Sequence, residues 1–113
     1  MVEFRLLRLH LPNGRCPFAD WFDSLPRHDR WIVDSRLLRL QRGNFGEINT
    51  IGGGVWELKF HRGAGLSIYY ARVGKQVLLL LAGGDKGSQN KDIQHAKKLF
   101  VAYEKEKLKN ENL

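Results

Sequence analysis

The chain has 113 residues, which is enough for one domain with a single core and too few for two. Its hydrophobic and charged fractions of 42% and 27% are ordinary for a globular protein, but 19 Lys and Arg against 12 Asp and Glu leave a net charge of +7. So basic a domain is expected to meet a polyanion or an acidic protein, and a merely solvated basic surface is the alternative.

The compartment is indicated by what the sequence lacks. Cys16 is the only cysteine, so an intrachain disulfide is excluded and a reducing compartment is favoured. Residues 2–6 alternate apolar and charged side chains and so lack the apolar segment of a signal peptide. The longest apolar run, 77–82, is too short to span a bilayer. We therefore expect a cytoplasmic protein that forms one domain over residues 1–113.

The N-terminal part predicts a strand and two helices. Residues 2–9 have a strand pattern, and a turn follows at 12–14. Pro17 suits the first turn of a helix, which we place at 17–25, and Pro26 ends it and opens a second helix that ends at Gly43. The two helices are expected to form an antiparallel hairpin packed on the sheet.

The second helix has two contrasting faces. Its apolar face is assigned to Trp31, Val33, Leu37, Leu38 and Leu40, and its other face to Arg27, Arg30, Arg36, Arg39 and Arg42. We interpret the arginine face first as a solvated surface, with a nucleic-acid face or a dock for an acidic partner segment as alternatives.

Three strand patterns follow between residues 54 and 88. In the first, apolar residues 56, 58 and 60 alternate with ionisable residues 57, 59 and 61. Residues 66–71 alternate similarly, and 77–82 is apolar throughout, as in a central strand. Short glycine-bearing turns separate the three, so an antiparallel meander is the simplest arrangement, entered through an irregular segment at 45–53.

The last helix begins after the glycine loop 83–88. Ile93, Ala96, Phe100 and Tyr103 form its apolar stripe, and the polar tail from about residue 104 to 113 is expected to fray. The order β-α-α-β-β-β-α, with the sheet and helices segregated, predicts a small α+β domain.

Strand alternation also predicts where reactive side chains converge. Glu57, Lys59 and His61 share one face of their strand, and Ser67 and Tyr69 lie opposite them if the register fits. Lys86 lies in the glycine loop, where backbone N–H groups and the helix dipole favour a phosphate. A solvated polar face is the alternative.

Several other kinds of site are excluded by spacing. The four histidines and the one cysteine show no ligand spacing, so we expect no metal and no cofactor. The loop 83–88 lacks the spacing of a P-loop, and no Ser/His/Asp arrangement is legible.

Four short motifs carry a resemblance to a known family. They are Gly-Asn-Phe-Gly at 43–46, Gly-Val-Trp-Glu-Leu-Lys at 54–59, Gly-Leu-Ser-Ile-Tyr-Tyr at 65–70, and Gly-Gly-Asp-Lys-x-x-Gln at 83–89 followed by Asp92-Ile93. With these motifs the chain resembles, over roughly residues 4–103, the RelE/ParE superfamily of bacterial toxins, and most closely its HigB-like branch, often labelled addiction module killer proteins.

The resemblance implies a toxin of a type II toxin–antitoxin system that inhibits translation as a metal-independent endoribonuclease, cleaving mRNA on the ribosome. Its partner would be a cognate antitoxin, a helix-turn-helix protein or an acidic and partly disordered one. The alternatives are a ParE-like, non-enzymatic inhibitor of DNA gyrase, and a basic RNA-binding domain without activity.

The resemblance also assigns site residues. The basic residues of the family motifs fall on Lys59 and Lys86, which would hold phosphate, and our own interpretation adds Glu57 and His61 for proton transfer. Similar sequences carry an arginine where this chain has Ser67, so either Arg62 or Arg72 substitutes for it or the activity is weak or altered. The expected substrate-binding residues are Arg62, Ser67, Tyr69, Arg72 and Gln89.

Overall fold

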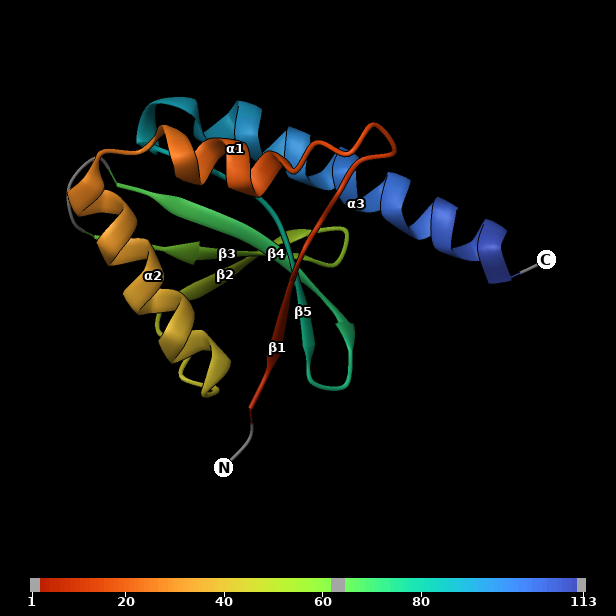
Figure 1. The fold of residues 1–113 in the computed structure, drawn as a ribbon, viewed down its shortest axis with the longest axis horizontal. Helices are drawn as coiled ribbons and strands as arrows, with labels where there is room; N and C mark the ends of the chain where they lie inside the picture. Colours follow the sequence, from red (N-terminus) through yellow and green to blue (C-terminus); the bar gives the residue numbers. More distant parts are fainter. Residues whose placement is uncertain (1–2, 62–64, 112–113) are drawn as a thin grey trace.

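In the computed structural model, which describes residues 3–61 and 65–111, helices cover both faces of a five-stranded sheet (Figure 1). The elements in chain order are β1 (Arg5–Arg8), α1 (Pro17–Ser24), α2 (Arg27–Gln41), β2 (Ile48–Gly52), β3 (Val55–Lys59), β4 (Ser67–Gly74), β5 (Val77–Gly84), a 3₁₀ turn η1 (Lys86–Ser88) and α3 (Gln89–Glu111). The predicted α+β class is confirmed.

The sheet is mixed, with strand order β1-β5-β4-β3-β2. Strands β2 to β5 pair antiparallel with their chain neighbours, whereas β1 pairs parallel with β5. A purely antiparallel meander is therefore wrong for the whole sheet. The reason is that α1 and α2 carry the chain from β1 at one edge to β2 at the other.

Strand β2 lies in the segment 45–53 that was expected to be irregular. It has only two partly buried isoleucines, Ile48 and Ile51, and so carries little strand pattern of its own. The chain reverses into β3 through Gly52, Gly53 and Gly54, whose φ angles of 90°, 66° and 83° are in the left-handed region that glycine tolerates. Pairing with β3, rather than propensity, makes this strand.

Two apolar layers hold the sheet between its helices. On one face α1 and α2 pack against the sheet through Phe18, Val33, Leu37, Leu40, Leu58, Ile68, Tyr70, Leu78 and Leu80. On the other face α3 packs through Ala96, Leu99, Phe100, Val55, Tyr69, Ala71, Leu79 and Leu81. Strands β4 and β5 are buried on both faces, which is why β5 is apolar throughout.

The helices differ from expectation in three respects. Figure 1 shows α1 and α2 meeting at a corner instead of lying side by side, because Leu25 and Pro26 between them are extended, with ψ of 148° and 152°. Trp31 and Leu38, assigned to the apolar face of α2, are exposed. Finally, α3 stays helical to Glu111 and projects past the sheet (Figure 1), since the Glu, Lys and Leu residues of its last turns are good helix formers.

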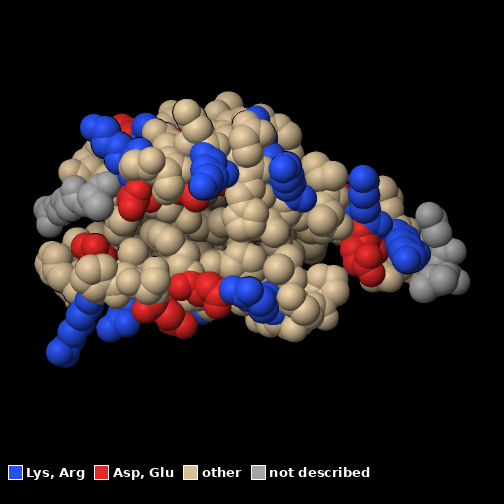
Figure 2. Space-filling view, turned by 90° about the horizontal axis from the view of Figure 1, so that it is seen from above, with Lys and Arg blue, Asp and Glu red and all other residues tan. Residues whose placement is uncertain are grey.

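Charge is spread over the surface. Figure 2 shows Lys and Arg side chains along the whole length of one face, with Asp and Glu between them. A specific site must therefore come from local geometry and not from the net charge of +7 alone. Among residues 3–61 and 65–111, no helix combines the length and apolarity needed to cross a membrane.

Candidate functional site

An open groove of about 550 Å³ lies where three strands end together. Strand pairing explains its position: Lys59 at the end of β3 lies opposite Ser67 at the start of β4, and Ser67 lies opposite Gly84 at the end of β5. The groove is lined by Lys59, Phe60, His61, Gly65, Leu66, Ser67, Lys86 and Gln89. It therefore brings together five of the predicted site residues, Lys59, His61, Ser67, Lys86 and Gln89.

A buried carboxylate lies beneath this groove. The Glu57 side chain accepts a hydrogen bond of 2.7 Å from the Ser67 hydroxyl and one of 3.0 Å from the Gln89 amide. Glu57 is only 2% exposed and Ser67 only 5%. Because Ser67 uses its proton toward Glu57, its oxygen lone pairs remain available to accept a hydrogen bond from a ligand in the groove.

Tyr69 lies beside this carboxylate, opposite Glu57 across the β3–β4 pair. Its hydroxyl is buried and makes no hydrogen bond of good geometry to a described residue, although Ser67 and Glu57 lie close enough to act on its proton. Burial, followed by the nearby charge of Glu57, raises the pKa of Tyr69 to about 12. Tyr69 is thus a neutral phenol under the site, and it does not line the groove.

Lys59 and Lys86 supply the positive charge of the groove. Neither ammonium has a carboxylate within 4.0 Å in the part of the chain that the structure describes. The stem of Lys86 packs next to Gly65, where an added Cβ would stand 3.2 Å from the Cβ of Lys86. Gly65 also has a φ of 69°, so this position favours glycine on two grounds.

Two backbone donors of the loop after β5, where a phosphate was expected, already have a partner within the chain. The carboxylate of Asp85 accepts hydrogen bonds of 2.9 Å from the Gly87 N–H and 3.2 Å from the Ser88 N–H. Ser88 Oγ in turn bonds to Asp92 at the start of α3. Because Asp85 already occupies two of the donors, an anion in the groove would depend on the lysine side chains.

His61 lies at the outer wall of the groove. Its Nε2 lies 2.9 Å from Glu47 Oε2, and the His61 side chain is 70% exposed. Glu57, Lys59 and His61 were expected on one strand face, but they occupy three environments: buried, partly buried and exposed. Strand β3 ends at Lys59, so His61 no longer follows the strand alternation.

Two arginines were considered as substitutes at Ser67. Arg62 is outside the described residues, and Arg72 does not line the groove. Arg72 lies toward the other end of β4, where its guanidinium stacks 5.4 Å from the Phe4 ring centroid and donates to the carbonyls of Gly74 and Lys75. Ser67 therefore donates its hydrogen bond to Glu57 and lies opposite Lys59, while Arg72 does not reach it.

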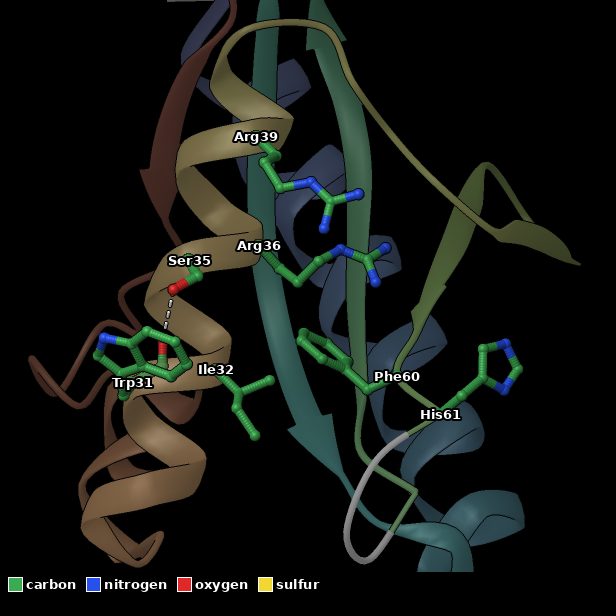
Figure 3. A pocket seen from close by; sticks show the side chains of 7 residues that line it. All are labelled: Trp31, Ile32, Ser35, Arg36, Arg39, Phe60 and His61. Carbon is green, nitrogen blue, oxygen red and sulfur yellow. Dashed lines mark hydrogen bonds between the residues drawn. The ribbon is translucent and has the colours of Figure 1, made fainter.

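Sequence reasoning missed a second groove of about 350 Å³, shown in Figure 3. It is lined by Trp31, Ile32, Ser35, Arg36 and Arg39 from α2, together with Phe60 and His61. The spacing of Trp31, Arg36 and Arg39 along α2 is the sequence signal that could have indicated this groove. The signal was not sufficient, because the sequence does not show which side of the helix faces the sheet.

Metal ligation has no support in the described geometry. Within residues 3–61 and 65–111, no three His, Cys, Asp or Glu side chains are grouped so that they could hold a metal ion. Cys16 is buried in the apolar core under α1.

The chain was compared with known proteins. No protein-family model matches it. A protein of Haemophilus influenzae described as uncharacterized is 42% identical over 83 residues, which cover 73% of this chain and 84% of that protein. The chain therefore belongs to the same family as this Haemophilus influenzae protein.

Proposed function

We propose that this protein is a RelE/ParE-superfamily toxin of the HigB-like branch, in which the groove between β3, β4 and α3 cleaves mRNA on the ribosome. The observation that carries the proposal is the convergence of Lys59, Ser67 and Lys86 over the buried Glu57 in one groove. Two ammonium groups that form no ion pair with the described residues suit a phosphodiester, and a buried carboxylate behind a hydroxyl suits proton transfer.

The proposed reaction uses the ribose 2′-hydroxyl as nucleophile. Its oxygen forms a bond to phosphorus while the bond from phosphorus to the 5′ oxygen breaks, which leaves a 2′,3′-cyclic phosphate. Lys59 and Lys86 bind the phosphate oxygens and stabilise the extra negative charge of the transition state.

Ser67 and Glu57 would take the proton of the nucleophile. Ser67 Oγ accepts the 2′-hydroxyl proton as it passes its own proton along the 2.7 Å hydrogen bond to Glu57. Gln89 holds the same carboxylate in place from α3. In this scheme the serine is part of the machinery, although similar sequences have an arginine at its position.

His61 is the candidate donor for the leaving 5′ oxygen. It lines the groove, and its Nε2 lies 2.9 Å from Oε2 of Glu47, which holds the ring at the groove wall. A cytoplasmic location and neutralisation by a cognate antitoxin belong to the same proposal.

A ParE-like inhibitor of DNA gyrase is the second candidate, and the serine at position 67 favours it. An arginine at this position would stabilise the transition state of RNA cleavage. Its replacement by serine therefore fits a groove that binds a target without cleaving it. Acute expression separates the two candidates: cleavage depletes translated messages, whereas gyrase poisoning produces double-strand DNA breaks.

The matched control for this experiment is Lys86→Ala. Under the ribonuclease proposal, wild-type expression shortens messages at positions occupied by ribosomes, as mapped by primer extension, and Lys86→Ala does not. DNA breaks with intact messages would show that the ribonuclease proposal is wrong.

A further inference from the structure

The second groove is continuous with the proposed cleavage site. Phe60 and His61 line both grooves, so a chain that leaves the first groove at His61 enters the second directly. Figure 3 shows the side chains of α2 on one side of this space, with Phe60 and His61 on the other. The second groove has a volume of about 350 Å³.

The side chains of α2 give this groove a positive charge, and no ion pair joins them to another described residue. The Arg36 guanidinium lies 5.0 Å from the Phe60 ring centroid and donates to the carbonyls of Lys59 and Phe45, at 3.3 Å and 3.2 Å. Its buried Nε has no partner among the described residues. Neither Arg36 nor Arg39 takes part in an ion pair within the described ranges.

The two arginines are close enough to affect one another. Burial, and next the charge of Arg39, lower the pKa of Arg36, while the carboxylate of Glu47 acts in the opposite direction. Glu47 itself is paired with His61 at the junction of the grooves. An anion between Arg36 and Arg39 would relieve the repulsion between them.

An exposed aromatic ring lies beside these charges. Trp31 is 65% exposed, although the neighbouring core positions of α2, Val33 and Leu37, are buried. Its ring is stacked on that of His28 at a centroid distance of 6.3 Å. Aromatic faces next to basic side chains are the usual elements of a surface that binds single-stranded nucleic acid.

We propose that this second groove binds a nucleotide of single-stranded RNA adjacent to the one held by Lys59 and Lys86, with its phosphate at Arg36 and Arg39 and its base against Trp31. The inference rests on the proposed function, because the continuity with the first groove selects RNA as the occupant. An acidic protein segment would explain the arginines, but it would not by itself require the exposed tryptophan.

The test measures binding of the full chain to a 2′-O-methyl uridine octamer, which lacks the 2′-hydroxyl needed for cleavage, at low salt. Trp31→Ala and Arg39→Ala should each weaken binding by about tenfold, the size of effect that loss of one stacking or charged contact commonly has. Trp31→Phe should keep most of the affinity.

Two control variants lie outside the groove, one on the same helix at Leu38 and one at its C-cap, Arg42. Leu38→Ala removes another exposed apolar side chain, and Arg42→Ala removes the same charge as Arg39→Ala. Both should bind the octamer as tightly as the wild type, within about twofold, since surface changes away from a site have small effects.

Four outcomes would overturn the inference. One is no binding of the octamer by the wild type at low salt, and another is equal losses in the control variants. The third is that an oligoglutamate peptide of matched charge binds as tightly as the octamer and loses as much affinity in Trp31→Ala. That result would make the occupant an acidic protein segment. If Lys86→Ala weakens octamer binding but Trp31→Ala does not, the second groove is not an RNA site and the proposed function still stands.

Discussion

The hydroxyl of Ser67 donates a 2.7 Å hydrogen bond to the carboxylate of Glu57, and both side chains are almost completely buried. The two residues are on neighbouring strands, and Gln89 from α3 donates to the same oxygen of Glu57. This network links the sheet to the start of α3 directly beneath the groove. It also gives the serine a partner that can accept a proton.

The first prediction concerns this pair. Glu57→Gln keeps the size of the side chain and an acceptor for Ser67 but removes the base, so we expect RNA cleavage to fall by about a hundredfold or more. Ser67→Ala should give a loss of similar size, and the double variant should lose little beyond either single one, because the residues act as a unit.

Single-turnover cleavage on programmed ribosomes measures these rates, and thermal melts show whether the variants are folded. A folded Ser67→Ala protein that cleaves at the wild-type rate would remove Ser67 and Glu57 from the proton path. Additive losses would show that the two residues act separately.

The second prediction concerns Lys86. It is exposed, so Lys86→Ala should change the free energy of unfolding by no more than about 0.5 kcal/mol. The same change should abolish growth arrest, because in the proposed reaction the ammonium stabilises charge in the transition state. Lys86→Arg should keep part of the activity, since the charge remains but its geometry differs.

Gly84→Val is the contrasting variant. A Cβ at Gly84 would overlap the carboxylate of Asp92 at the start of α3, so this variant should lose stability as well as activity. Growth arrest by a well-folded Lys86→Ala protein would contradict the assigned role of Lys86.

The strands that build the site could be predicted from the sequence, but the burial of Glu57 beneath the groove could not. Period-2 alternation predicted strands over 56–61 and 66–71, which overlap β3 and β4 but differ from them at the ends. It allowed Ser67 and Tyr69 to lie opposite the ionisable residues of the first strand, and the structure pairs Ser67 with Lys59 and Tyr69 with Glu57. The burial of Glu57 depends on Gln89, 32 residues away, which packs there only once α3 covers the sheet. No local pattern carries that information.

The second helix shows the same limit. Its apolar residues span positions 31 to 40, and a helix cannot bury all of them on one narrow face. The structure buries Val33, Leu37 and Leu40 and leaves Trp31 and Leu38 exposed. The angle between α1 and α2 decides which apolar residues of α2 are buried. That angle depends on the two extended residues at the junction, Leu25 and Pro26.

The third prediction concerns salt. If Lys59 and Lys86 each contact an RNA phosphate, replacing either by alanine should reduce the slope of log affinity against log salt by about one. Lys98→Ala, an exposed change on α3 outside the groove, is the matched control and should leave the affinity nearly unchanged. Titration with the uridine octamer measures the slopes, and equal slopes for all variants would argue against phosphate contacts in the groove.

The fourth prediction concerns the antitoxin. We expect an acidic, partly disordered segment of the antitoxin to order on this basic chain and to cover the groove. Lys59 and Lys86 should then react more slowly with an amine-labelling reagent in the complex than in the free chain, while Lys98 should serve as the exposed reference. Unchanged labelling of Lys59 and Lys86 would exclude direct coverage of the groove.

The last prediction concerns stability at high pH. Burial raises the pKa of both Tyr69 and Tyr70 to about 12, against an ordinary value of 10.0. Between these values the unfolded chain loses tyrosine protons that the folded chain keeps. The contribution of these two groups to stability is therefore complete below about pH 10, and it falls as the pH rises toward 12.

Thermal melts from pH 9 to 11.5 measure this loss, and Tyr69→Phe separates it from the titration of lysines. The substitution removes a buried hydroxyl that makes no hydrogen bond of good geometry to a described residue, so it should not destabilise the chain at pH 7. It should also make the melting temperature fall less steeply above pH 10. If Tyr69→Phe and the wild type fall in parallel, the Tyr69 phenol ionises as easily in the folded chain as in the unfolded one, and its burial beside Glu57 has no effect on its proton.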